Sequence, residues 1–331
     1  MRTRTLSGIP PNLSRAWRRT VSNTARSATR PTTLEHLCIS EKTRVVYQGF
    51  TGTTATNNAK EAIAHGTRIV GGVSTNKGGT THLGLPVFDN ISQAAKQLKP
   101  DASLVYVPAV AAASAIEQAI EAEVPLIVSL AEHVPAHDML RVHQMLRTQT
   151  ASRLLGPNCP GIIAPSKCRI GIIPAAQCTP GRVGIVSRSG TMIYEAVGAT
   201  GRVGLGQSLA IGLGGDMMPG TTMEEALQVL IEHDQTEAII LIGEIGGNSE
   251  FRTADAIREY YLDASTKTKK PIIAIISGRT APEGRVMGHA GALLSPGEQG
   301  AMAKARALED AGATVLPHLG MLDRVLQSTL R

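Results

Sequence analysis

The chain has 331 residues, of which 42% are hydrophobic and 18% are charged, so it has enough apolar material for about two packed domains. Aromatic residues make up only 3%, which argues against a base-stacking surface for nucleic acid. No stretch approaches the roughly 18–20 apolar residues of a membrane span, and the four cysteines form no CxxC pair of the kind that holds zinc. The net charge of +6 comes from seven arginines in the first 30 residues, because the other 26 of the 33 Lys and Arg nearly balance 27 Asp and Glu.

The N-terminal 34 residues form the first predicted segment. They are rich in Arg, Ser and Thr, and the first acidic residue of the chain is Glu35. Apolar residues such as Leu6, Leu13 and Trp17 recur here at near-helical spacing. This composition is typical of a mitochondrial transit peptide, with a disordered or RNA-binding basic tail as the alternative. We therefore expect residues 1–34 to be removed on import into the mitochondrial matrix.

Residues 35–160 are predicted to form the first of two α/β domains. Short apolar or β-branched runs are typical of buried parallel strands, and they occur at 44–48, 68–71, 103–107, 125–130 and 152–156. Helical patterns lie between them, at 110–123 and 136–148. Strands that alternate with helices favour a doubly wound sheet.

A second α/β domain is predicted for residues 181–331, after a linker at 161–180 with little periodicity. Its strands are expected at 183–187, 208–212, 238–242, 271–277 and 314–317. Its helices are expected at 192–199, 222–233, 249–262, 298–311 and 320–330. The same alternation again favours a doubly wound parallel sheet.

A glycine-containing loop, residues 48–55, follows the first predicted strand. A helix is expected to begin near Asn57 or Asn58 and to end at Gly66, and Asn58 with Glu61 three residues later fits a capping box. Glycines next to a helix N-terminus suit a phosphate or pyrophosphate, although an ordinary tight turn explains the pattern equally well. Lys77 lies in a later loop, where it either reaches an anion held by the first loop or is a solvated surface lysine.

Three further sequences in the second domain suggest chemistry. Ser189, Gly190 and Thr191 follow a strand and open a helix, which suits either an oxyanion or simple capping. Glu244 ends a buried strand between glycines, where it either orients an imidazole or is a solvated loop residue. His289 is flanked by glycines, so its imidazole is uncrowded and available as a nucleophile, with a structural role as the alternative.

From about residue 40 to its C-terminus the chain resembles the α subunits of succinate–CoA ligase, also called succinyl-CoA synthetase. Seven short segments carry the resemblance in the same order and spacing: QGFTG at 48–52, VGGVSTNKGGTTHLGLPVF at 70–88, LLGPNCPG at 154–161, GIVSRSGTMIYEAV at 184–197, GGD at 214–216, TEAIILIGEIGG at 236–247 and TAPEGRVMGHAGA at 280–292.

The resemblance implies a fold, a reaction and a partner. The expected fold is an N-terminal Rossmann-like CoA-binding domain followed by a C-terminal flavodoxin-like ligase domain. The expected reaction belongs to the tricarboxylic acid cycle and interconverts succinyl-CoA, NDP and phosphate with succinate, CoA and NTP through succinyl phosphate and a phosphohistidine. The expected partner is an ATP-grasp β subunit, which forms a heterodimer and binds Mg²⁺ with ADP/ATP or GDP/GTP.

The resemblance also assigns residues. The phosphohistidine falls on His289, the glutamate that orients it falls on Glu244, and a substrate contact falls on Tyr194. A phosphohistidine needs positive dipoles around it, which the helix start at Ser189, Gly190 and Thr191 supplies. The CoA-binding positions fall on Thr51, Gly52, Thr53, Thr54, Lys77, Leu130, Ala131 and Glu132.

The chain departs from the family pattern at three places. The first loop has Ala55, Asn57 and Asn58 where the family has glycine, phenylalanine and histidine. The usual VPPPFA reads VPAVAA at 107–112, and the usual AGGKG reads SPGEQ at 295–299. Weakened CoA binding is expected if Ala55 replaces a glycine needed for positive φ or for close phosphate approach. The altered CoA loop therefore makes a non-catalytic paralogue that regulates the β subunit one alternative; the other is a ligase for another acid, since the sequence does not show which carboxylate is bound.

Overall fold

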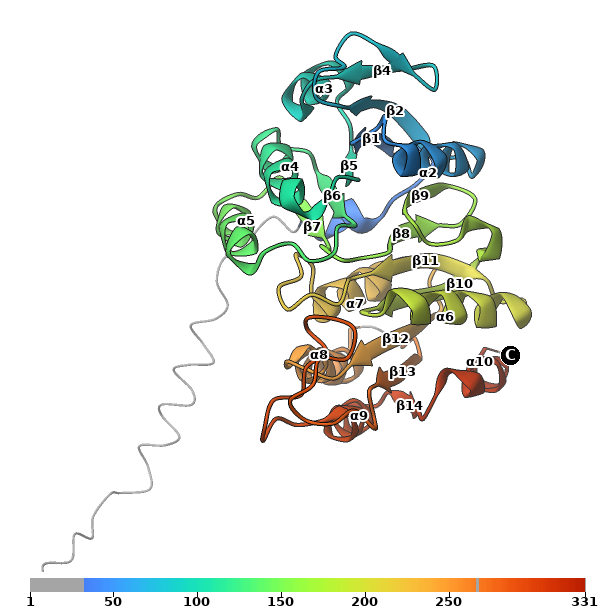
Figure 1. The fold of residues 1–331 in the computed structure, drawn as a ribbon. Coiled ribbons are helices and arrows are strands. Elements are labelled where there is room, and N and C mark those ends of the chain that lie inside the picture. Colours follow the sequence, from blue (N-terminus) through green and yellow to red (C-terminus); the bar gives the residue numbers. More distant parts are fainter. Residues whose placement is uncertain (1–32, 266–267, 331) are drawn as a thin grey trace, which may run out of the picture. The chain divides into compact units, whose positions relative to one another are not determined.

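The computed structural model describes residues 33–265 and 268–330. The stretch from Thr33 onward forms one compact unit, and it contains two seven-stranded sheets (Figure 1). Most of the predicted transit peptide, residues 1–32, lies outside the described residues. No helix in the described ranges has the length and apolarity needed to cross a membrane.

The first sheet has the strand order β3-β4-β2-β1-β5-β6-β7. All neighbouring strands are parallel except the short antiparallel pair β3–β4. The order from β4 to β7 is that of a Rossmann sheet, which confirms the predicted fold. The elements are β1 Arg44–Gln48, α2 Thr53–Ala64, β2 Arg68–Val73, β3 Thr81–His82, β4 Leu85–Phe88, α3 Ile91–Leu98, β5 Ala102–Val105, α4 Ala109–Glu121, β6 Leu126–Ser129, α5 Ala136–Thr148 and β7 Arg153–Leu155.

The second sheet has the strand order β14-β13-β12-β10-β11-β8-β9. Its five parallel strands, β10 to β14, follow the flavodoxin order, as predicted. Helices α6 and α10 pack together, and α7, α8 and α9 pack together as a second group (Figure 1). The elements are β8 Gly161–Ala164, β9 Cys168–Gly171, η2 Ala175–Gln177, β10 Pro180–Ser187, α6 Gly190–Arg202, β11 Gln207–Gly212, α7 Met223–Glu232, β12 Ala238–Glu244, α8 Ser249–Leu262, β13 Ile272–Ser277, α9 Ala301–Asp310, β14 Thr314–Leu316, η3 Leu319–Met321 and α10 Leu322–Thr329.

The predicted linker at 161–180 is instead part of the second sheet. Its β8 and β9 form an antiparallel hairpin, and β8 pairs with the edge strand β11. Ile162, Ile163 and Ile170 are fully buried there. The runs are only four residues long and lie between prolines, so they give a weak strand signal although they contribute to the core.

The folded part of the chain also begins earlier than predicted. Residues Thr33–Leu37 form a 3₁₀ helix, η1, whose Leu34 and Leu37 are buried. Thr33 accepts a hydrogen bond on its Oγ1 from Nε of Arg153 at 2.9 Å. A boundary between residues 34 and 35 therefore cuts through a packed element, and the folded region starts no later than Thr33.

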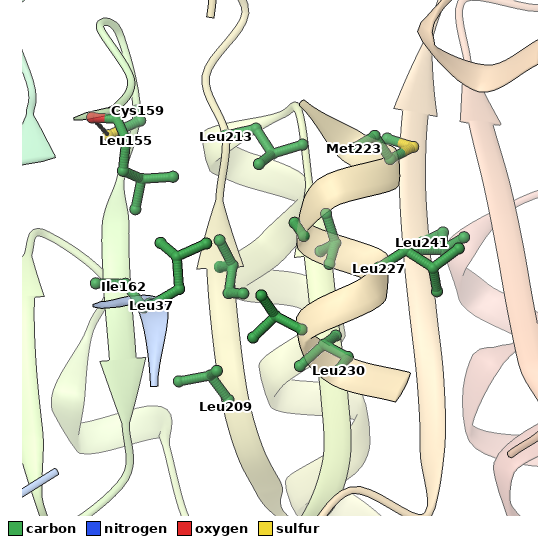
Figure 2. Packing of buried hydrophobic residues seen from close by; sticks show 14 of the residues in the cluster. Leu37, Leu155, Cys159, Ile162, Leu209, Leu213, Met223, Leu227, Leu230 and Leu241 are labelled. Atoms are coloured by element: carbon green, nitrogen blue, oxygen red, sulfur yellow. Dashed lines mark hydrogen bonds between the residues drawn. The ribbon is translucent and has the colours of Figure 1, made fainter. Parts of the chain in front are cut away.

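One hydrophobic cluster draws on both sheets. Figure 2 shows Leu37 of η1 beside Leu155 and Ile162, with Leu209 of β11 and Leu227 of α7 in the same cluster. All five side chains are 1% exposed or less. The two sheets therefore share part of their core, which stabilises the segment between them.

Helix α2 begins four or five residues earlier than predicted, at Thr53, so Asn58 lies inside it and caps nothing. Asn58 is buried, accepts a hydrogen bond from the Tyr47 hydroxyl at 2.9 Å and donates one to the carbonyl of Gly171 in β9 at 2.9 Å. Arg169 of β9 donates its backbone N–H to Thr67 Oγ1, also at 2.9 Å. The hairpin β8–β9 is thus bonded to the α2–β2 region of the first sheet.

Candidate active site

His289 lies in a hairpin loop, residues 284–294, between β13 and α9. Two backbone hydrogen bonds close the loop, from Gly284 to Leu294 and from Met287 to Ala292, and Val286 and Leu293 form an antiparallel bridge. The sharp turn before the histidine uses Gly288, whose φ is +88°. That φ lies in the left-handed region, which glycine adopts without strain.

The loop packs against the turn that follows β11. Gly291 donates its N–H to the carbonyl of Gly215 at 2.9 Å. A Cβ added to Gly215 would lie 2.1 Å from Cγ of His289, so the imidazole packs directly on the Gly215 backbone. The glycine in the GGD segment is therefore required for the ring to lie where it does.

Glu244, the last residue of β12, contacts this ring. Its Oε2 lies 2.8 Å from Nδ1 of His289, and its side chain is 5% exposed against 28% for the histidine. The hydrogen bond with Glu244 raises the pKa of His289 above its ordinary value, although burial opposes the shift. Since the carboxylate accepts the Nδ1 proton, the lone pair of the neutral ring lies on Nε2. That nitrogen is the one available as a nucleophile.

Three charged residues behind Glu244 were not singled out as site residues from the sequence. Arg188, Glu250 and Lys304 form a buried ion-pair chain that reaches the second oxygen of Glu244. Arg188 lies in the SRSGT segment, whose Ser189, Gly190 and Thr191 are predicted to bind phosphate. Glu250 and Lys304 lie on α8 and α9, where charged residues usually mark a solvated face, so the pattern around them does not indicate a site.

A cavity of about 670 Å³ opens beside His289. It brings His289 together with Glu132, one of the predicted CoA-binding residues, and with three residues that the sequence did not single out for function, His133, Asn158 and Asp216. Asn158 donates from Nδ2 to Asp216 Oδ1 at 3.0 Å, and burial raises the pKa of Asp216. The rest of the lining is mostly apolar and consists of Val134, Ala136, Met139, Met217, Met218, Val286, Gly288, Ala290 and Leu293.

The predicted phosphate-binding residues lie at the start of α6, outside the lining of this cavity. Ser189 is the N-cap, and its hydroxyl accepts a hydrogen bond from the N–H of Met192 at 3.4 Å. Gly190 and Thr191 begin the helix. Tyr194 is half-buried against the core on the α6 side of the sheet, and burial raises its pKa. The capping interpretation of Ser189 is therefore confirmed, and it leaves the first-turn N–H groups of α6 without acceptors inside the helix.

The predicted CoA loop brings Thr51 and Lys77 together. Lys77 donates from Nζ to Thr51 Oγ1 at 3.0 Å, and the backbone N–H of Thr51 donates to Ser74 Oγ at 3.1 Å. Gly52, Thr53 and Thr54 are exposed at the start of α2. Free first-turn N–H groups and a nearby lysine ammonium suit the phosphates of CoA.

The backbone of Ala55 does not have the positive φ at which an alanine would be strained. Ala55 lies in the first turn of α2, and its φ is not in the left-handed region. Its side chain is only 2% exposed. The methyl group therefore points into the protein, where it neither strains the backbone nor obstructs a ligand at the loop.

Leu130, Ala131 and Glu132 follow β6, at the same edge of the sheet as the loop after β1. The carbonyl of Ala131 accepts a hydrogen bond from the N–H of Asn158 at 3.0 Å. Glu132 is the member of the three that lines the cavity. This segment thus connects the first sheet's ligand-binding edge with the cavity that contains His289.

Two family profiles match the chain. A CoA binding domain matches residues 40–133, and a CoA-ligase domain matches residues 186–314. The first contains β1, α2 and the loop with Lys77, and the second contains Glu244 and His289. Each match therefore covers one of the two sites described above.

Solved structures share the fold. An ATP citrate lyase from Methanothrix soehngenii in complex with citrate and coenzyme A has a TM-score of 0.77 at 23% identity, with 89% of this chain matched to about half of that one (50%). A dinucleotide forming acetyl-coenzyme A synthetase from Candidatus Korarchaeum cryptofilum has a TM-score of 0.68 at 19% identity, with 86% of this chain matched to 60% of that one. At these identities the likeness shows the fold alone.

Curated relatives match over nearly their whole length. The chain is 42% identical to the succinate–CoA ligase [ADP-forming] subunit alpha 1 of Archaeoglobus fulgidus, over 84% of this chain and 93% of that one. It is 40% identical to the corresponding subunit of Aquifex aeolicus, over 89% of this chain and 95% of that one. At this identity and coverage, the chain belongs to the family of succinate–CoA ligase alpha subunits.

Proposed function

We propose that this chain is the catalytic α subunit of a succinate–CoA ligase, which interconverts succinyl-CoA, NDP and phosphate with succinate, CoA and NTP in the tricarboxylic acid cycle. The 2.8 Å contact between Glu244 Oε2 and His289 Nδ1 carries the proposal. It fixes the ring so that Nε2 is the nucleophilic nitrogen beside a cavity of about 670 Å³. The relatives' names give the reaction class.

In the proposed reaction, His289 Nε2 attacks the phosphorus of succinyl phosphate. The bond between phosphorus and the acyl oxygen breaks, and succinate leaves with the electron pair of that bond. The ring is then an imidazolium that carries the phosphoryl group, and Glu244 stabilises its positive charge through the Nδ1 proton. Attack by an NDP oxygen on the same phosphorus restores the neutral ring, so the histidine is unchanged after each cycle.

CoA is proposed to bind with its phosphates at the loop of Thr51 and Lys77. The ammonium group, the hydroxyl and the exposed helix start fit an anion of this kind. Its thiol end would reach the cavity past Glu132, which lines it. The mostly apolar lining fits a long, weakly polar arm.

The nucleotide and its Mg²⁺ are proposed to bind to an ATP-grasp β subunit, which forms a heterodimer with this chain in the mitochondrial matrix. The relatives are named as α subunits, which supports such a partner. The arginine-rich, acid-free N-terminus supports import. Purified alone, the chain is then expected to show no NTP-dependent activity.

Labelling with NTP tests the proposal. The complex with the β subunit, incubated with Mg²⁺ and γ-labelled NTP, is expected to carry an acid-labile, base-stable phosphate on His289. His289→Asn is expected to abolish labelling and turnover together, whereas His137→Asn, a change at an exposed histidine of α5, leaves both intact. Glu244→Gln is expected to slow labelling without preventing assembly. Labelling that survives His289→Asn would contradict the assignment.

Turnover assays separate the two alternatives. Succinate-dependent turnover supports the main proposal. Turnover with a different acid in its place would make the chain a related acyl-CoA ligase subunit. If the complex of this chain with the β subunit is not labelled by NTP, but the chain still changes the activity of a separate catalytic αβ pair, the chain would be a regulatory paralogue.

A further inference from the structure

The two oxygens of the Glu244 carboxylate have different partners. Oε2 lies 2.8 Å from His289 Nδ1, whereas Oε1 has no hydrogen-bond partner among the described residues and forms an ion pair with Nη2 of Arg188 at 3.2 Å. The Glu244 side chain is 5% exposed and that of Arg188 is 10% exposed, so water screens neither contact well. One carboxylate is therefore shared between an imidazole and a guanidinium.

Arg188 is itself held in place from behind. Its Nη1 lies 2.9 Å from Glu250 Oε1 and 3.2 Å from the carbonyl of Gly246. Glu250 Oε2 lies 2.5 Å from Nζ of the fully buried Lys304, which also donates to the carbonyls of Glu244 and Gly246 at 2.9 and 2.8 Å. Two cations and two carboxylates thus form a charge-balanced, buried chain that ends at the imidazole.

We propose that Arg188 is a positioning residue for phosphoryl transfer. It forms an ion pair with one oxygen of Glu244, so that the other oxygen points at His289 and the guanidinium partly offsets the negative charge beside the imidazole. This inference rests on the proposed role of His289 as a nucleophile. It adds residues that do not touch the reacting atoms but act through Glu244.

The reason for sharing the carboxylate is chemical. A carboxylate beside an imidazole favours the imidazolium, which has no lone pair on Nε2 and cannot attack phosphorus. The guanidinium opposes this effect, so Glu244 orients the ring while favouring its protonated form less strongly. The pKa of His289 is raised mainly by the hydrogen bond with Glu244, while Arg188 and burial act against that rise.

Other charges also face the ring and enter the balance. Glu132 and Asp216 line the cavity beside His289. Glu132 favours the protonated form of the His289 ring, and the ring in turn favours the ionised form of Asp216. Burial would raise the pKa of Glu250, but Arg188 and Lys304 outweigh it and hold that pKa below the ordinary glutamate value. Glu250 therefore stays ionised and continues to neutralise Arg188.

The arrangement predicts two shifts of opposite sign. Arg188→Met removes a positive charge near the ring and leaves Glu244 unshared, so the pKa of His289 is expected to rise further. Glu250→Gln leaves Arg188 less neutralised, so the pKa of His289 is expected to fall. A loss of structural integrity alone predicts no such reversal of sign.

The test measures how fast diethyl pyrocarbonate modifies His289 in the complex with the β subunit, as a function of pH. The reagent attacks the unprotonated ring nitrogen, and mass spectrometry of the digest reports each histidine separately, with exposed His137 as the internal reference. Arg182→Met is the matched control, because Arg182 lies near the other end of β10 in an exposed pair with Glu237. It is expected to leave the modification profile of His289 unchanged.

The double variant Arg188→Met, Glu250→Gln keeps the buried charge balanced, which protects folding. Its His289 profile is expected to shift to higher pH, as in Arg188→Met alone. Unshifted profiles, or shifts of the same sign in both single variants, overturn the inference. Modification by diethyl pyrocarbonate needs no NTP, so the two proposals can fail separately. If the wild-type complex is not phosphorylated by NTP while the profile shifts occur, only the proposed function is overturned. If phosphorylation is normal but the profiles do not shift, only the inference is overturned.

Discussion

Replacing Ala55 with glycine tests whether the altered CoA loop weakens ligand binding. The sequence alone suggested that Ala55→Gly would tighten CoA binding. The structure reverses this expectation, because Ala55 lies in the first turn of α2 with its methyl group buried. The backbone N–H groups that would meet a phosphate are the same in both variants, so the Kd for CoA is expected to change by no more than about twofold.

The substitution is expected to cost stability instead. Glycine in a helix is about 0.5–1 kcal/mol worse than alanine, and a buried methyl contributes about 0.8 kcal/mol more. The free energy of unfolding is therefore expected to fall by about 1–2 kcal/mol, which lowers Tm by about 2–6 °C.

Calorimetric titration with CoA and a thermal melt measure the two effects on the same sample. Ala59→Gly is the matched control, since Ala59 is fully buried one turn further along α2, away from the loop. It is expected to lower Tm similarly and leave the Kd unchanged. A fall of about tenfold in the Kd for CoA in Ala55→Gly, worth about 1.4 kcal/mol, would refute this reasoning and show that the methyl obstructs the ligand.

Three other substitutions test the structure at separate places. Leu37→Ala is expected to lower the free energy of unfolding by about 2–5 kcal/mol because this side chain is fully buried in the shared core; an unchanged denaturant midpoint would count against its packing. Gly215→Ala is expected to displace the ring of His289 and suppress phosphohistidine labelling while CoA still binds by calorimetry. The backbone N–H of Ser295 and, to a lesser extent, that of Gly247 donate to the Glu298 carboxylate and hold its pKa below its ordinary value. A group with a lowered folded-state pKa stabilises above its unfolded pKa and loses that effect as the pH falls through the folded pKa, so Glu298→Gln is expected to lower Tm at neutral pH and not in strong acid.

The fold was predictable where the chain gives long, uniform patterns. The strand Ala238–Glu244 is entirely buried and apolar up to its last two residues, so its position was predicted from residue 238 onward. Strands β8 and β9 were missed because four-residue runs between prolines and glycines resemble a linker. The start of α2 was predicted too late, since its first turn is rich in threonine, which disfavours helices when packing is not considered.

The candidate site was predictable only in its centre. Glu244 and His289 lie between glycines in segments that resemble a known family, and the structure places them in contact. Lys304 could not be found in this way, because a lysine on an amphipathic helix is usually solvated. Its full burial follows from tertiary packing, which gives its ammonium group three acceptors.

The bonded hairpin β8–β9 has a mechanical consequence for how ligands enter and leave. Separating the two sheets would break the hydrogen bonds from Asn58 to the Gly171 carbonyl and from the Arg169 N–H to Thr67, each worth about 0.5–1.5 kcal/mol, and would expose the shared core. Gly288, by contrast, lies in a short loop held by a few backbone hydrogen bonds, the contact between His289 and Glu244, and the buried Ala292 and Leu294. If His289 moves between two sites in the proposed reaction, displacement of that single loop is therefore expected to require less free energy than separation of the two sheets.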